Sequence, residues 1–265
     1  MTMFDPSTSP AIQSRRQKSG EGKPFTSDLD VEGYVLLEEA GFEPLGLVLG
    51  SSVYHIGIQI ARWKQNEELT KLTQAMYSAR QLAISRIVAE AEALGADGVT
   101  AVRLTTQMYV GGEDILEFLA IGTAVRSKSN PGAYRTPTGQ PFTSHLTARE
   151  FYLLHKAGHI PVSLVLGTCV YHLAHQGIRQ TFGQAGQNIE VAVLTQGTYD
   201  ARELALGRMQ DEAIAEQAEG VVGVSTSLSS HVWGEHAIEF FAVGTSIRSS
   251  PGGSPIPEPN MVLAL

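Results

Sequence analysis

The sequence predicts an α+β protein made of two tandem copies of one domain, each with the element order ββαββ. Three observations lead to this prediction. A long block of the chain occurs twice, each copy carries one long helical pattern, and short apolar runs flank each helix. We therefore expect each domain to hold one antiparallel sheet that a single long helix covers on one face.

The repeat is the strongest of these observations. Residues 24–55 align with residues 141–172 without a gap, and 17 of the 32 positions are identical. Both blocks end in Leu-Val-Leu-Gly followed, two residues later, by Val-Tyr-His. The second copy then carries five extra residues, so the offset between the copies rises from 117 to 122. Two long copies fit duplicated domains better than a solenoid, which needs more and shorter repeats.

The elements of the first copy follow from the spacing of its apolar residues. Two short apolar runs separated by Gly41 and Pro44 predict two strands and a turn, and Gly50 in the second run predicts a bend. Apolar residues three and four apart then predict one face of a long helix, with Gly95 at its C-cap. The expected elements are strands at 34–37 and 45–54, a helix at 67–94 and strands at 99–104 and 115–125.

Composition shifts divide the chain. We expect a disordered N-terminal tail at 1–22, domain 1 at 23–127, a polar linker at 128–139, domain 2 at 140–249 and a flexible C-terminal tail at 250–265. The last tail ends in apolar residues. They are candidates for an anchor that docks on a partner protein, although a tail without function is the alternative. The candidate anchor residues are Met261, Val262, Leu263 and Leu265.

Composition also excludes some classes of partner. The formal net charge of -8 argues against nucleic acid, because phosphate binding needs clustered cations. No apolar run approaches the length of a membrane span, so no membrane partner is expected. The single cysteine forms no internal disulfide and fits a reducing compartment. A cytoplasmic protein is the resulting expectation.

The end of the first predicted helix resembles the YbjQ-like family. The segment Ala89–Val99 reads AEAEALGADGV, and in that family a helix closes with an ALGADAV-type segment and enters a strand. A Tyr-Ser-Ala-Arg segment at Tyr77 and a closing Gly-Thr-Ala-Val at Gly122 also match. The resemblance covers each repeat almost completely. It implies a dodecin-like fold whose subunits close into rings, typically of five, and the family carries a heavy-metal-binding label.

One constellation has the chemistry of a metal site. Cys169, His172 and His175 are three residues apart and offer a thiolate and two imidazoles, a ligand set for a divalent or soft metal ion. The first copy has Ser52 and His55 at the first two places. Positions three apart in a strand point to opposite faces, which favours the alternative of a buried thiol and a structural histidine.

Several polar residues shared by both copies are candidates for interface or ligand contacts. The candidates are Tyr54, His55, Arg80 and Glu117 in the first copy, and Tyr171, His172, Arg202 and Glu239 in the second. Glu117 lies in an apolar run, where a carboxylate is costly unless it is paired or faces water. One hypothesis pairs Glu117 with Arg80 or His55, within a subunit or across a ring. A glutamate on the solvated face of a strand is the alternative.

No motif predicts catalysis. Phosphate-binding glycine loops and nucleophile elbows are absent, and no nucleophile, base and orienting group recur together. We expect a non-enzymatic homo-oligomer that forms a ring, such as a pentamer, and serves as a scaffold or binding protein. The alternative is a heavy-metal or small-ligand-binding protein with sites at subunit seams near His55 and His172. An enzyme is the third alternative, and one ring or two stacked rings both remain open.

Overall fold

The computed structural model of this 265-residue chain describes residues 25–55, 57, 65–108, 115–174, 191–230 and 237–250. Three sequence predictions lie outside these residues. They are the disordered tail at 1–22, the third metal ligand His175 and the apolar C-terminal anchor at 261–265.

Apart from the short strands β2 and β5, the two halves of the chain repeat one order of elements. The first half holds α2 (Val31–Glu39), β1 (Phe42–His55), the short β2 (Glu67–Glu68), α3 (Thr70–Ala93), β3 (Gly98–Met108) and β4 (Ile115–Ser127). The second half holds β5 (Phe142–Thr143), α4 (Ala148–Lys156), β6 (His159–His172), α6 (Ala192–Ala215), β7 (Gly220–Ser230) and β8 (Ala237–Ser249). Among these helices, none is long and apolar enough to cross a membrane.

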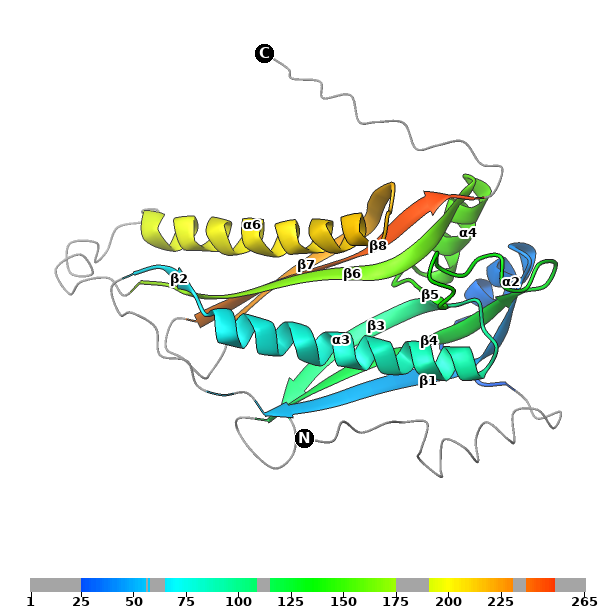
Figure 1. The fold of residues 1–265 in the computed structure, drawn as a ribbon, viewed down its shortest axis with the longest axis horizontal. Coiled ribbons are helices and arrows are strands. Elements are labelled where there is room, and N and C mark those ends of the chain that lie inside the picture. The colour runs from blue at the N-terminus through cyan, green and yellow to red at the C-terminus, as the bar shows by residue number, and fades with distance from the viewer. Residues whose placement is uncertain are drawn as a thin grey trace, which may run out of the picture.

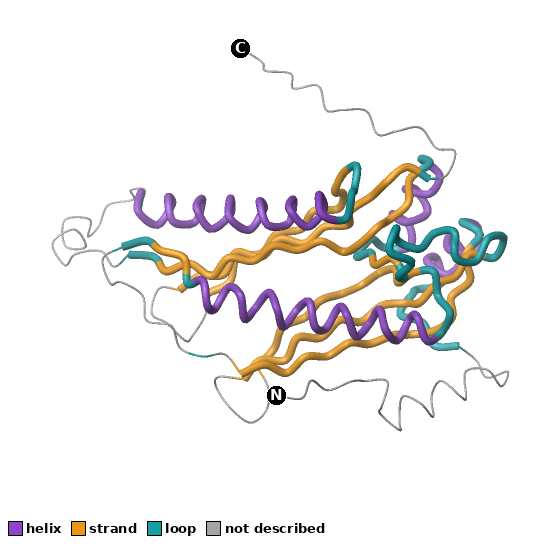
Figure 2. The backbone as a smooth tube through the Cα atoms, viewed as in Figure 1, coloured by secondary structure: helices purple, strands orange, loops and turns teal. Residues whose placement is uncertain are grey.

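The elements stack in four layers. The first sheet has the order β1-β4-β3-β5 and the second has the order β2-β6-β8-β7. Apart from β5, which runs parallel to β3, all neighbouring strands are antiparallel. Helix α6 lies on the outer face of the second sheet, and α3 lies between the two sheets (Figure 1). Helices and sheets therefore alternate through the molecule (Figure 2).

The predicted ββαββ order is wrong at its first element. Residues 31–39 form a helix, which begins where the Asp30 carboxylate accepts the Gly33 N–H at 2.6 Å. The matching helix of the second half begins with a capping box of Thr147 and Glu150. A run of four apolar residues fits a strand or a helix equally well, and the N-caps decide for the helix. Within the described residues, each half therefore holds two helices and not one.

Gly50 does not bend the chain as predicted but lies inside the continuous strand β1. A Cβ atom on Gly50 would lie 2.0 Å from the backbone oxygen of Ala83 in α3. The equivalent Gly167 in β6 has the same relation to Ala205 of α6, at 1.8 Å. The glycine of each Leu-Val-Leu-Gly segment is thus the point where the helix backbone crosses the strand in direct contact.

The main hydrophobic core joins both halves. Met76 and Ile87 of α3 pack in one cluster with Phe118 of the first sheet and with Leu166 and Val170 of the second. All five side chains are almost completely buried. Helix α3 therefore has apolar contacts on both sides, as a helix between two sheets requires.

Candidate functional site

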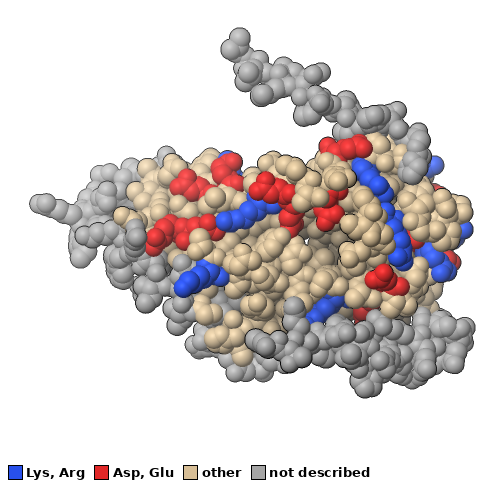
Figure 3. All heavy atoms as spheres, in the orientation of Figure 1, with Lys and Arg blue, Asp and Glu red and all other residues tan. Residues whose placement is uncertain are grey.

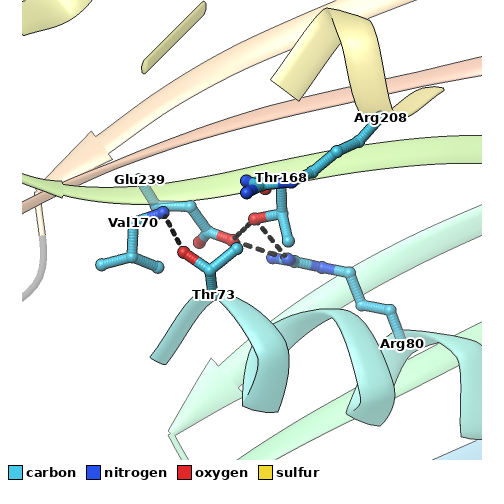
Figure 4. A network of polar contacts seen from close by, with 6 residues as sticks. All are labelled: Thr73, Arg80, Thr168, Val170, Arg208 and Glu239. Carbon is cyan, nitrogen blue, oxygen red and sulfur yellow. Dashed lines mark hydrogen bonds and ion pairs between the residues drawn. The ribbon is translucent and has the colours of Figure 1, made fainter. Parts of the chain in front are cut away.

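A buried ion pair connects α3 to the second sheet. The Arg80 guanidinium lies 2.6 Å from the Glu239 carboxylate, and their side chains are only 6% and 3% exposed (Figure 4). The Thr168 hydroxyl donates to the same carboxylate oxygen at 2.6 Å. The Phe241 ring lies under the guanidinium, 4.2 Å from its centroid. Charge pairing, a hydroxyl donor and an aromatic face together compensate for burying two charges.

This arrangement corrects the hypothesis that Arg80 pairs with Glu117. Arg80 pairs instead with Glu239, which occupies the place of Glu117 in the second half. The Glu117 carboxylate accepts from the Ser51 hydroxyl and from the Gln107 amide, both at 2.9 Å. The pairing therefore joins the two halves of the chain and leaves Glu117 on the far face of the first sheet.

Three further contacts extend this junction along α3. The Thr73 hydroxyl accepts the Val170 N–H at 2.9 Å (Figure 4). The Leu69 N–H donates to the Val170 carbonyl at 2.8 Å. The Tyr77 hydroxyl donates to the carboxylate of Glu212 on α6. We call the contacts of Thr73, Tyr77 and Arg80 with Thr168, Val170, Glu212 and Glu239 the seam.

Burial perturbs the ionisation of the Tyr77 and Glu212 pair. Burial, together with the hydrogen bond to Glu212, raises the pKa of Tyr77 to about 12. Burial also raises the pKa of Glu212, although the Leu166 N–H and the Tyr77 hydroxyl oppose that shift. The phenol keeps its proton at neutral pH and so acts as a donor to the carboxylate.

Sequence reasoning missed a clamp that holds each long helix to its strand. In the second half, the Arg208 guanidinium donates to the Thr168 carbonyl at 2.8 Å and Glu212 accepts the Leu166 N–H at 2.7 Å. In the first half, the matching residues bind the outer edge of β1 in the same way. There Arg86 donates to the Ser51 carbonyl and Glu90 accepts the Leu49 N–H at 2.8 Å. The signal that could have found this clamp is an Arg-x-x-x-Glu segment at the same place in both helices.

The two sheets differ in what covers their faces. Leu166 and Val170 of β6 face α3 and are both 0% exposed. Their counterparts in β1, Leu49 and Val53, are 41% and 49% exposed, because no described element covers that face of the first sheet. The helices show the same contrast: Arg80 is 5% exposed, while the Arg202 side chain is 42% exposed.

The other predicted contact residues divide between two environments. Tyr54 packs in the main core and Tyr171 donates to Asp200 of α6 at 3.3 Å, so both face the helix of their own half. His172 is buried on the α3 side of β6, opposite Glu67 of β2. His55 is exposed on the open face of the first sheet. The structure therefore gathers His172, Arg80 and Glu239 between the two halves and leaves their counterparts at the surface.

The predicted metal ligands do not converge within the described residues. Cys169 packs against α6, whereas His172 lies on the opposite face of β6. Burial raises the pKa of the Cys169 thiol to about 12, which disfavours the thiolate that a metal needs. In the described ranges, no three His, Cys, Asp or Glu side chains form a metal-binding group. Because His175 lies outside those ranges, the triad stays a prediction.

A hollow of ≈ 470 Å³ lies beside the seam. Its lining mixes hydroxyl and charged groups, including Thr73, Tyr77, Thr168, Arg208 and Glu212. A second hollow of ≈ 450 Å³ shares Tyr77 and Glu212 with the first. The Tyr77–Glu212 contact therefore separates two cavities between the halves.

The fold and the seam define a class of protein: an α+β fold in which a long helix of the first half covers the sheet of the second half. Comparison with known proteins gives the family. The model of the YbjQ family, described as "Putative heavy-metal-binding", matches residues 43–128. A UPF0145 protein of Pseudothermotoga lettingae is 35% identical over 103 residues, which cover 37% of this chain and 91% of that protein.

A longer relative matches both halves. The encapsulin nanocompartment protein Rv1762c of Mycobacterium tuberculosis is 47% identical over 254 residues, 96% of each chain. A UPF0145 protein of Halorubrum lacusprofundi is 45% identical over 89 residues, 32% of this chain and 84% of that protein. The chain belongs to the YbjQ family of UPF0145 proteins, which confirms the resemblance seen in its sequence.

Proposed function

We propose that this protein is a non-enzymatic scaffold that assembles head to tail by repeating its internal seam between copies. The chain then consists of two tandem YbjQ-like units, at residues 23–127 and 140–249. The family model matches only within the first, and the shared order of elements supports extending the unit to the second. The observation that carries the proposal is the uncovered face of the first sheet.

The internal seam is heterologous: α3 covers the second sheet, while α6 makes no comparable contact with the first sheet among the described elements. Such a contact leaves one complementary surface free on each outer side of the stacked layers. One is the outer face of α6, with Tyr199 and Arg202. The other is the open face of the first sheet, with Leu49, Val53 and Glu117. A second copy can join these surfaces by the same geometry that already joins the two halves.

The repeated seam has defined contacts. Arg202 of one copy takes the place of Arg80 and pairs with Glu117 of the next copy. Ser51 already donates to Glu117, as Thr168 donates to Glu239. In the isolated chain Arg202 pairs with its neighbour Glu203 at the surface, a contact of little strength that assembly can replace.

Repetition of this seam makes the two units of a chain successive members of one assembly. A closed ring of whole chains then holds an even number of units, and ring closure removes both open faces. The name of the relative from Mycobacterium tuberculosis, an encapsulin nanocompartment protein, supports a role in a large assembly.

Complementary charge reversals test the proposal. We expect Arg202→Glu chains to stay unassembled because two carboxylates would meet at the junction, and Glu117→Arg chains to stay unassembled because two guanidinium groups would meet there. When the two variants are mixed, their chains can alternate. Each junction then joins either the two native side chains or the two substituted ones, and both combinations carry opposite charges. The mixture should therefore recover assembly, measured by light scattering and native mass spectrometry.

The matched control is Lys156→Glu, which makes the same change of charge at an exposed position at the end of α4. It should assemble as the unsubstituted chain does. Recovery on mixing is the decisive outcome, because a variant that simply misfolds cannot be rescued by another variant. Equal assembly of all single variants, or an unsubstituted chain that stays monomeric, would falsify the proposal.

Small-ligand or metal binding is the second candidate function, favoured by the polar hollow of ≈ 470 Å³ beside the seam. A ligand there would contact Thr73, Arg208 and Glu212. Native mass spectrometry of protein purified without an affinity tag reports bound mass together with subunit number. A bound mass that is lost in the Arg208→Met variant would support this candidate. A measured mass equal to that of the chain alone would count against it.

A further inference from the structure

The geometry points to an exchange of strands between copies: residues 25–29 of one copy add to the outer edge of β7 in the neighbouring copy. This inference rests on the proposed head-to-tail assembly and names a second contact at the same junction. An equivalent strand addition already exists inside the chain.

The segment that opens the second half completes the sheet of the first half. Its strand β5 runs parallel to the outer edge of β3. The Ser144 N–H donates to the Val99 carbonyl at 2.9 Å, and the Ser144 carbonyl accepts the Val102 N–H at 2.9 Å. The Leu146 carbonyl accepts the Ala101 N–H at 3.1 Å. Residues 142–146 thus bind their neighbouring half through main-chain hydrogen bonds, as in strand addition by a peptide.

An aromatic side chain fixes the position of this segment. Phe142 is 1% exposed, and its ring packs directly on Gly98, where a Cβ atom would lie 2.2 Å from the ring. Glycine is required at this place because any side chain would displace the ring. Gly220 occupies the matching place at the start of β7.

The segment that opens the first half has the same sequence. Pro-Phe-Thr-Ser occurs at residues 24–27 and again at residues 141–144. Phe25 is 46% exposed and stacks on Tyr34, with the ring centroids 5.8 Å apart, whereas the matching Phe142 is buried. The Phe25 side chain therefore lies at the surface, whereas the matching Phe142 side chain is inserted between the two halves.

Residues 25–29 are held against the first half in the same way as residues 142–146 are held against the second half. The Ser27 hydroxyl lies 3.3 Å from the hydroxyl of Thr123 in β4. The Ser144 hydroxyl lies 3.2 Å from the hydroxyl of Thr245 in β8, the matching strand. Each segment is thus anchored to its own half, and residues 25–29 need no large movement to present their outer side to another copy.

The edge of β7 is the matching acceptor. Arg86 and Glu90 clamp the outer edge of β1, Arg208 and Glu212 clamp that of β6, and β5 covers β3. Strand β7 ends the second sheet, and no described strand pairs with its other side. An open edge of this kind is a template for a further strand.

Exposure on β7 agrees with a missing strand. Val224 is 46% exposed, while its counterpart Val102 beside β5 is 2% exposed. The expected hydrogen bonds run from the Ser27 N–H to the Val221 carbonyl and from the Val224 N–H to the Ser27 carbonyl. The Phe25 ring then covers Gly220, as Phe142 covers Gly98.

A disulfide formed between chains tests the register. Thr143 is the partner of Val99 in the β5–β3 pair, so Thr26 of one copy should lie beside Val221 of the copy whose Arg202 meets its Glu117. We would mix Thr26→Cys chains with Val221→Cys chains, oxidise them mildly, and count covalent dimers on a non-reducing gel. We expect dimers in the mixture and few with either variant alone. The unsubstituted chain controls for Cys169, which is buried.

Ser227→Cys is the matched control, since it lies on β7 but about 20 Å from position 221 at the rise of an extended strand. It should give few dimers with Thr26→Cys. Dimers that form equally with Ser227→Cys, or that fail to form while light scattering shows assembly, would overturn the strand exchange and leave the head-to-tail proposal intact. Chains that never assemble overturn both.

Phe25→Ala supplies a second measurement. Because Phe25 is half-exposed in the isolated chain, this variant should fold normally and weaken assembly by about tenfold or more, the effect of losing a buried aromatic contact. Phe142→Ala should instead destabilise the single chain, since that ring is buried within it. Unchanged assembly of Phe25→Ala would contradict the exchange.

Discussion

Arg80 and Glu239 form an ion pair 2.6 Å long between residues 159 positions apart in the chain, and both side chains are almost completely buried. The pair joins the helix of the first half to the sheet of the second. Each partner has a counterpart at the same place in the other half, Arg202 and Glu117, and these two do not meet within the chain. This asymmetry is the basis of the predictions that follow.

Replacing Arg80 with Met should lower the free energy of unfolding by about 3–5 kcal/mol, because Glu239 would remain buried without its cation. Urea denaturation followed by circular dichroism measures the change. Arg202→Met is the matched control and should change the unfolding free energy by less than about 1 kcal/mol, since that side chain is 42% exposed. Equal effects of the two substitutions would contradict the role given to the buried pair.

Gly167→Ala should destabilise the chain strongly, because the new Cβ atom would lie 1.8 Å from the Ala205 oxygen and force α6 off its sheet. We expect a loss of about 3 kcal/mol or more in unfolding free energy. Gly207→Ala in the same helix has open space around its new atom and should stabilise the chain by about 0.5–1 kcal/mol. A tolerated Gly167→Ala would show that the close crossing is not required.

Glu212 should make stability fall with rising pH. Burial raises its pKa in the folded chain above the usual 4.5, so the folded state binds the proton more tightly than the unfolded state. The contribution to stability is therefore full below about pH 4.5 and is lost as pH rises through the folded pKa. Glu212→Gln should remove this part of the slope in urea titrations at several pH values. An unchanged slope would assign the pH dependence to other groups.

Glu203→Gln should strengthen assembly. In the internal seam the Gln81 amide donates to the Glu212 carboxylate at 2.6 Å. At the repeated seam Glu203 takes the place of Gln81 and Glu90 that of Glu212, so two carboxylates meet. On the face shown in Figure 3, acidic side chains also gather along α6. We expect about tenfold tighter assembly for Glu203→Gln at neutral pH.

Sedimentation at neutral pH measures the difference in assembly between Glu203→Gln and the unsubstituted chain. Arg149→Glu, at an exposed place on α4, controls for the effect of total charge. Equal assembly of the unsubstituted chain and Glu203→Gln would rule out this contact.

The Cys169 thiol should not react with a disulfide reagent at pH 8 in the folded chain. The thiol is 0% exposed, so the reagent cannot reach it, and burial raises its pKa to about 12, so the reactive thiolate does not form at pH 8. One thiol per chain should react after unfolding in urea. Rapid reaction of the folded chain would contradict this prediction.

Cys169→Ala should likewise leave the affinity for Zn²⁺ unchanged in equilibrium dialysis, because the thiol and His172 lie on opposite faces of β6. His175→Ala tests the remaining member of the predicted metal triad. Loss of one bound Zn²⁺ per chain with each of these substitutions would establish the triad against the placement of Cys169.

The spacing of apolar residues in the sequence is enough to predict the long helices and the strands that follow them, but not the first helix of each half. A helix predicted at 67–94 is observed at Thr70–Ala93, because apolar residues three and four apart can form one face only in a helix. Strands predicted at 99–104 and 115–125 lie within the observed β3 and β4. Gly95 ends α3 with a positive φ of 71°, as its place after the helix indicated.

Packing between residues far apart in the chain determines which partner each repeated residue meets. Arg80 could pair with Glu117 or with Glu239, because the duplicated halves offer the same carboxylate in the same local sequence. The choice depends on which sheet face α3 covers, and that is set by packing between residues far apart in the chain. For the same reason no local pattern could show that Gly50 meets a helix, that β5 joins the first sheet, or that β7 ends the second sheet without a further described strand.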